Sequence, residues 1–191
     1  MAGISKCSLW RLGGSRYVLY TGPLDQIPLA RRLRVPELSP PWLEDSWVRL
    51  TRLLLASYRN WLATELVDRA GTLPEQAERL FEAPFVVVAH ETQPDPVLCY
   101  ANRTALRLWE TDLPALLQMP SRLTAEPMHR DERALLLERT TRNGYVDDYR
   151  GVRISSTGRR FEIEQAIVWN LVDESNVYRG QAATFSNWKY L

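Results

Sequence analysis

Two histidines are the side chains best suited to metal binding or acid–base chemistry in this chain. His90 is followed by Glu91, with Asp95 close behind, whereas His129 stands apart. Imidazole and carboxylate groups at such a spacing can bind a metal ion or share a proton. However, a single histidine at the end of a strand, beside a turn, is more often structural. We therefore expect no metal site and no catalytic residue, and we do not expect an enzyme.

Signatures of the common nucleophilic and nucleotide-binding sites are missing. Serine, histidine and aspartate occur without a nucleophile-elbow pattern. Gly13-Gly14 is not followed by the lysine and hydroxyl residue of a phosphate-binding loop. Cys7 and Cys99 are too far apart in sequence to indicate a disulfide framework or a metal motif. This cysteine usage favours a cytoplasmic protein with reduced thiols.

Arginines on the expected strands are the other chemically notable group. Arg150, Arg153 and Arg160 exceed what solvated strands need, and a buried arginine must be paired. We favour structural pairing with nearby carboxylates. The alternative is a pocket between sheet and helices that holds a small carboxylate or another polar ligand. Its expected lining joins aromatic walls to a few polar anchors, namely Asn102, Leu106, Trp109, Arg122, Gln165 and Trp169.

Residues 145–188 supply the elements that must position these side chains. Strand-like runs at 149–155, 160–171 and 178–187 are separated by the turn signals Ser156-Thr157-Gly158 and 173–176. Two short turns in succession predict a three-stranded antiparallel meander. Alternation along the middle strand places one set of residues toward a core beneath helices, consisting of Phe161, Ile163, Gln165, Ile167 and Trp169. Ala166 and Val168 fall on the other face, so that face needs a cover as well.

A long amphipathic helix is predicted over residues 42–70, ending at Gly71. We expect this helix to lie over Ala166 and Val168 on the back of the sheet. Its apolar stripe, which includes Trp47, is wide for a helix that covers one surface. Part of the stripe is therefore expected to pair with a second subunit.

The middle of the chain predicts alternating short elements. A helix at 73–82 with Thr72 as its N-cap precedes strands at 85–89 and 97–100. Helical segments follow from Asn102, at 112–119 and at 132–142, the last with Asp131 as N-cap and Gly144 at its C-terminus. Five strands with a helical block between the second and the third describe a single α+β domain.

Composition limits the partners that the protein is expected to have. The 191 residues carry a net charge of +1 and contain no apolar run long enough to span a membrane. Residues 1–41 hold six basic and two acidic residues among several prolines, so we predict a basic, Pro-rich extension before a domain at 42–191. The remaining chain is mildly acidic, and we expect no nucleic-acid partner. A secretory signal pattern is also missing from the N-terminus.

Several motifs, in order, resemble those of the MEKHLA domain, a PAS-like family. They are APFVVVAH at 83–90, YANRTAL at 100–106, PSRLTAE at 120–126, YRGVRIS at 149–155, GRRF at 158–161 and GQAA at 180–183. The family occurs at the C-terminus of plant class III homeodomain-leucine zipper factors and as small bacterial proteins. This chain resembles the stand-alone bacterial type, because it has neither a homeodomain nor leucine heptads.

The resemblance implies a PAS-like five-stranded antiparallel sheet with helices on one face and an N-terminal capping helix. It further implies a sensory or interaction module in signalling or regulation that binds a small ligand, a protein partner, or both. The family supplies no agreed cofactor and no catalytic residues. The alternative is a small haem- or metal-containing protein or enzyme that uses the PAS cavity, with His129 as the haem ligand. The flavin-binding cysteine motif of PAS photosensors is not present.

Overall fold

The computed structural model describes residues 8–12, 15–19, 39–125 and 130–191, with side chains at 39–125 and 134–191. Contacts within the chain group it into two units, residues 1–39 and 40–191. In the first unit, β1 (Ser8–Leu12) and β2 (Ser15–Leu19) pair antiparallel. The predicted boundary between residues 41 and 42 stays a prediction.

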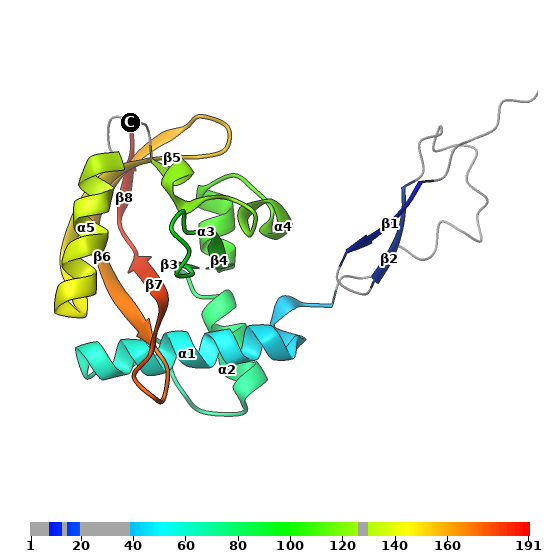
Figure 1. Cartoon of the computed structure of the whole chain (residues 1–191), viewed down its shortest axis with the longest axis horizontal. Helices are drawn as coiled ribbons and strands as arrows, with labels where there is room; N and C mark the ends of the chain where they lie inside the picture. The colour runs from blue at the N-terminus through cyan, green and yellow to red at the C-terminus, as the bar shows by residue number, and fades with distance from the viewer. Residues whose placement is uncertain (1–7, 13–14, 20–38, 126–129) are drawn as a thin grey trace, which may run out of the picture. The chain divides into compact units, whose positions relative to one another are not determined.

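The second unit is built on one antiparallel sheet with the strand order β4-β3-β7-β6-β5 (Figure 1). Its strands are β3 (Val86–His90), β4 (Leu98–Ala101), β5 (Tyr145–Ile154), β6 (Arg160–Val172) and β7 (Tyr178–Phe185). A short strand, β8 (Trp188–Tyr190), also pairs with β6. The predicted meander and the joining of the two early strands to it are confirmed.

A β-bulge in β6 decides which of its side chains share a face. Two residues separate Ile163 from Ala166 on β6, while only one separates their partners Gly151 and Tyr149 on β5. Because of the extra residue, alternation restarts, and Phe161 lies on the same face as Ala166. The prediction from simple alternation was therefore wrong beyond Ile163.

Past the bulge, each β6 side chain lies on the face opposite to the predicted one. Ile167 and Trp169 face away from the helical block, and Gln165 is exposed. Val168 packs instead against the helical side, with Leu136. The expectation that the long N-terminal helix covers Ala166 and Val168 is accordingly wrong.

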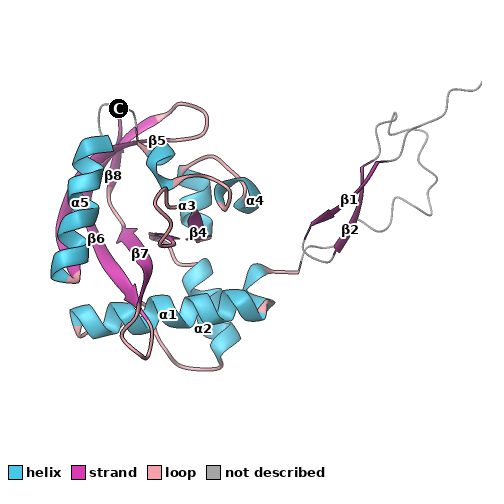
Figure 2. Ribbon diagram, viewed as in Figure 1, coloured by secondary structure: helices cyan, strands magenta, loops and turns pink. Residues whose placement is uncertain are grey.

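Helix α1 (Asp45–Leu62) covers the outer face of the sheet after a 3-10 turn, η3 (Pro41–Leu43) (Figure 2). Trp47 is 7% exposed and stacks on Tyr100 of β4 with ring centroids 4.6 Å apart. Tyr58 meets Trp169 of β6 edge-on at 5.1 Å. The predicted cover on the back of the sheet is thus confirmed, although it rests on other β6 residues.

The long helix is shorter than predicted. It ends at Leu62 because Ala63 adopts a left-handed conformation with φ of 56°, and its N–H donates to the Arg59 carbonyl. Leu66 and Val67 still pack against the core, but from irregular backbone. The predicted helix extended too far because Leu66 and Val67 continue the apolar spacing of α1.

The other helices follow the predicted order. Helix α2 (Leu73–Phe81) begins at a capping box between Thr72 and Glu75. The inner face of the sheet carries α3 (Arg103–Leu108), α4 (Leu113–Leu116), the 3-10 turn η4 (Ser121–Thr124) and α5 (Arg130–Asn143). Because α5 already includes Arg130, the prediction of Asp131 as its N-cap was wrong. Gly144, with φ of 88°, follows the helix as predicted.

Asn102 joins three elements through its amide, namely β3, α3 and the end of α2. Its Oδ1 accepts from the backbone N–H of Val87 and of Ala105, both at 3.0 Å, so it pairs with β3 and caps α3. Its Nδ2 donates to the Phe85 carbonyl at 2.6 Å and lies 3.4 Å from the carbonyl of Ala83, just after α2. The side chain is fully buried. Each donor and acceptor of the amide therefore serves the backbone.

We predict that Asn102→Ala lowers the free energy of unfolding by about 2–4 kcal/mol, because two buried N–H groups and a buried carbonyl lose their partner. Asn102→Asp should cost at least as much at neutral pH, since an oxygen then faces the Phe85 carbonyl. Urea denaturation measures both. Asn60→Ala on the exposed face of α1 is the control and should change stability by less than about 0.5 kcal/mol. A neutral Asn102→Ala would contradict the role of this amide.

Candidate functional site

A cavity of about 70 Å³ lies between the inner face of the sheet and the helices that cover it. Its wall is mainly apolar and includes Val88, Leu98, Ile163, Ala166, Val168 and Phe185. Leu136 and Leu137 of α5 close one side. The polar members of the lining are His90, Trp109, Ser121, Thr124, Tyr149, Arg153 and Gln181. Apolar walls with a few polar groups are typical of small-molecule sites.

Tyr149 and Arg153 form the charged corner of the cavity. Both belong to β5, where Tyr149 pairs with Ala166 and Arg153 with Phe161. The guanidinium Nη2 donates to the Tyr149 hydroxyl at 2.7 Å, and Nη1 donates to the Val152 carbonyl at 2.9 Å. The guanidinium also lies over the Tyr149 ring at 5.2 Å, a cation–π contact.

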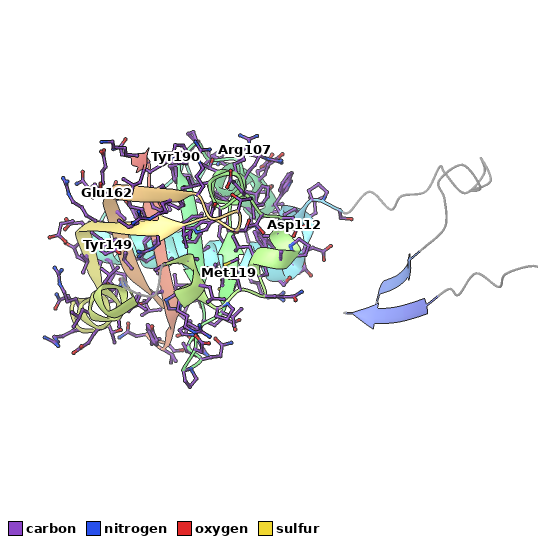
Figure 3. The ribbon with its side chains drawn as sticks, turned by 90° about the horizontal axis from the view of Figure 1, so that it is seen from above. Arg107, Asp112, Met119, Tyr149, Glu162 and Tyr190 are labelled. Atoms are coloured by element: carbon purple, nitrogen blue, oxygen red, sulfur yellow. The ribbon has the colours of Figure 1, made fainter. Side chains whose placement is uncertain are left out.

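Gly151 makes room for this pair. A Cβ at position 151 would lie 2.0 Å from the Tyr149 hydroxyl oxygen, so no other residue fits there while the ring keeps its position. Tyr149, labelled in Figure 3, packs with Met119 against the apolar cluster of the inner face. The sequence therefore places a tyrosine and an arginine side by side on one strand with a glycine between them.

Trp109 forms the facing wall. It follows the last residue of α3 and is 3% exposed. Its ring meets Phe161 edge-on, with centroids 5.3 Å apart. Its indole Nε1 has no hydrogen-bond partner among the residues that the structure describes. Phe161 thus has Trp109 on one side and Arg153 beside it across the strand pair.

The turn between β5 and β6 fixes the segment that carries Trp109. Ser155 donates to the Glu110 carboxylate at 2.7 Å, and Thr157 donates to the same oxygen. The Ser156 N–H donates to the Trp109 carbonyl at 3.0 Å. The hydroxyl hydrogen bonds from Thr157 and then Ser155 hold the pKa of Glu110 below its usual range.

A polar network fastens α5 over the cavity. Asn170 of β6 and Gln181 of β7 are direct neighbours across the sheet, and Gln181 donates to the Asn170 side chain at 3.0 Å. Both amides also donate to carbonyls of α5, at Thr140 and Leu137, each at 3.0 Å. The helix is thereby held through hydrogen bonds in addition to apolar contacts.

Of the six residues predicted to line a pocket, the structure brings only Trp109 to this cavity. Asn102 is occupied by backbone groups, and Leu106 lies where the two faces of the core meet. Arg122 is exposed and pairs with Asp95 at 3.0 Å. Gln165 is exposed, and Trp169 faces α1. Their role in ligand binding stays a prediction that this placement does not favour.

The predicted lining lacked Tyr149 and Arg153, although an excess of strand arginines marked the region. The bulge explains Gln165 and Trp169, because it turned both away from the helical side. The favoured pairing of Arg153 with a carboxylate is not what the described residues show, since its partners are a hydroxyl and a carbonyl. Arg150 is exposed.

Of the residues first considered for chemistry, His90 and Cys99 lie in the described part of the chain. The Nδ1 atom of His90 lies 2.8 Å from the Glu91 carbonyl oxygen, and no group of three potential metal ligands occurs within the described part of the chain. His129, the predicted haem ligand, lies outside the described residues. Burial raises the pKa of the Cys99 thiol to about 12, which disfavours the reactive thiolate.

This sheet order, with its helical block, is a PAS-like fold. The PAS domain of a protein from Colwellia psychrerythraea matches with a TM-score of 0.53 and 12% identity, over 62% of this chain and 96% of that chain. The sequence itself is matched by the model of the MEKHLA domain over residues 48–190. The chain therefore belongs to the MEKHLA domain family, a PAS-like sensory domain.

Plant homeobox-leucine zipper proteins are among the relatives. Homeobox-leucine zipper protein HOX9 of Oryza sativa subsp. indica is 27% identical over 143 residues, which cover 74% of this chain and 17% of that protein. Homeobox-leucine zipper protein ATHB-9 of Arabidopsis thaliana is 33% identical over 103 residues, or 53% of this chain and 12% of that one. The chain thus spans less than a fifth of either relative. Its assignment to a stand-alone bacterial type stays a prediction.

We predict that stability falls at acid pH and that Glu110 contributes to the fall. Because its folded pKa is lower than its unfolded one, the contribution is complete above the unfolded value, about 4.3, and is lost as pH falls through the folded value. Glu110→Gln should flatten the dependence of unfolding free energy on pH between about 3 and 5. Asn60→Ala, on the exposed face of α1, changes no titratable group and should leave it unchanged. Equal slopes in wild type and Glu110→Gln would contradict the prediction.

Proposed function

We propose that this chain is a sensory or interaction module that binds a small ligand in the cavity on the inner face of the sheet. The observation that carries the proposal is the cavity itself, whose lining combines apolar walls with buried polar groups. Membership in a PAS-like sensory family supports it. We propose no catalysis.

The size of the cavity restricts the ligand. At about 70 Å³ it has about half the volume of the ~150 Å³ cavity known to hold benzene. A ligand of a few heavy atoms fits without rearrangement of the helices. Among the residues that the structure describes, no helix is long and apolar enough to cross a membrane.

We predict that Ala183→Leu abolishes ligand binding, because Ala183 of β7 lines the cavity and the larger side chain fills it. Native mass spectrometry of protein purified from its host should show a non-covalent adduct on wild type and none on the variant. Ala56→Leu, on the exposed side of α1, should keep the adduct. Wild-type protein without any adduct would contradict ligand binding, and an adduct retained by Ala183→Leu would place the ligand elsewhere.

We further propose that α1 forms a contact with a second copy of this chain. An open groove of about 600 Å³ runs between α1 and the turn after β6. Leu50, Leu53 and Cys99 are partly exposed in it. Charged groups of both signs border it, including Arg52, which pairs with Glu174 at 2.5 Å. Apolar groups inside a rim of mixed charge suit a self-complementary contact.

We predict that Leu53→Glu shifts the protein toward the monomer in sedimentation equilibrium, since it places a charge in the apolar part of the groove. Because Leu53 is only partly buried, the fold should survive the change. Asn60→Glu, on the same helix outside the groove, is the matched control. A wild-type monomer at all concentrations, or an unaffected Leu53→Glu dimer, would contradict contact through α1.

A further inference from the structure

The buried guanidinium in the cavity has no counter-charge among the residues that the structure describes. Arg153 is 6% exposed, and the groups that it contacts are the Tyr149 side chain and the Val152 carbonyl. A guanidinium has five N–H donors, and the hydrogen bonds of Arg153 to described residues use two of them. Burying a charge without a counter-ion is costly. The cavity therefore carries a buried positive charge that a bound hydrogen-bond acceptor would stabilise.

Two further donors belong to the same lining. The Tyr149 hydroxyl accepts from Arg153, which leaves its own proton to donate. The indole Nε1 of Trp109 is buried without a partner within the described part of the chain. Both residues line the cavity, and Phe161 neighbours both Trp109 and Arg153. Donors with remaining hydrogen-bonding capacity that line one cavity are suited to bind an acceptor.

We propose that the cavity binds a short-chain monocarboxylate, with Arg153 as the charge partner and Tyr149 and Trp109 as neutral donors. The inference rests on the proposed ligand-binding function. A planar carboxylate matches the fork of donors that a guanidinium presents. The aliphatic part of the ligand packs against Ile163 and Phe185 of the apolar wall. A volume of about 70 Å³ suits an acid of the size of acetate or propionate.

Other classes of ligand fit the lining less well. A neutral ligand leaves the guanidinium unpaired, and a cation adds repulsion. A large anion such as a nucleotide exceeds the volume of the cavity. A bare inorganic anion of high charge gains nothing from the apolar wall, which makes up most of the lining. The combination of one buried positive charge, neutral donors and apolar surface therefore points to a small organic acid.

The test compares propionate with its neutral isostere propionamide by isothermal titration calorimetry on the whole chain. Propionate should bind with one-to-one stoichiometry and raise the melting temperature in a saturable manner. Propionamide should bind at least about tenfold more weakly, because it lacks the charge. Equal binding of the two compounds, or no binding of either, would overturn the inference.

Two variants assign the charge to its residue. Arg153→Met keeps the aliphatic stem and should weaken propionate binding at least about tenfold, while Arg150→Met removes an exposed arginine of the same strand and should not change it. Tyr149→Phe keeps the ring and should weaken binding about threefold to tenfold. The phenylalanine variant also keeps the test decisive if Arg153→Met does not fold. Wild-type affinity in either cavity variant would contradict the assignment.

The inference and the proposed function can fail separately. If native protein carries a neutral adduct that Ala183→Leu removes, the cavity binds a ligand but the carboxylate class is wrong. If no adduct is found and neither propionate nor propionamide binds, both are wrong. An adduct with the mass of a small acid, lost in Ala183→Leu and in Arg153→Met, supports both together.

Discussion

The bulge in β6 determines what the cavity is made of. The bulge adds one residue between Ile163 and Ala166, so the side chains of both residues point to the inner face of the sheet. Without it, Trp169 would occupy the space under the helices, and Val168 would lie beneath α1. The interruption between β7 and β8 lies at the same level, because the Glu164 N–H donates to the Asn187 carbonyl. The alternation of side chains between the two faces is therefore interrupted at the same level in neighbouring strands. Separate apolar clusters pack on the two faces of the sheet.

Hydrogen bonds from polar side chains hold α3 and α5 on the sheet, because these two helices offer little apolar surface for packing. Helix α3 has only six residues, and Asn102 ties its first turn to β3 and to the end of α2. Helix α5 carries few apolar residues, and the amides of Asn170 and Gln181 hold its C-terminal half. Such hydrogen bonds contribute modestly when made, but they are costly to lose in a buried place. The position of the cavity wall depends on them.

Local patterns predicted the elements well, while relations between distant residues were harder to predict. Turn residues and alternation predicted the meander, and several short motifs in order, including the one at 100–106, indicated the family. The bulge has no composition signal in β6, so the pocket lining drawn from alternation included Gln165 and Trp169. The hydrogen bonds of the Asn102 amide could not be predicted either, because its partners Phe85 and Val87 are distant in sequence. The end of α1 at Ala63 is not marked by glycine or proline and depends on the backbone around it.

Asn170 also connects the two sides of the sheet mechanically. Its side chain binds the end of α5, its N–H donates to the Gly144 carbonyl at 2.8 Å, and its own carbonyl accepts from the Trp61 indole of α1 at 2.9 Å. The Trp61 ring leaves no space for a Cβ at Gly144. A displacement of α5 away from the cavity would therefore disturb the contacts of Trp61, on α1, with Asn170 and Gly144. Asn170 therefore links the end of α5 on the inner face of the sheet to α1 on the outer face.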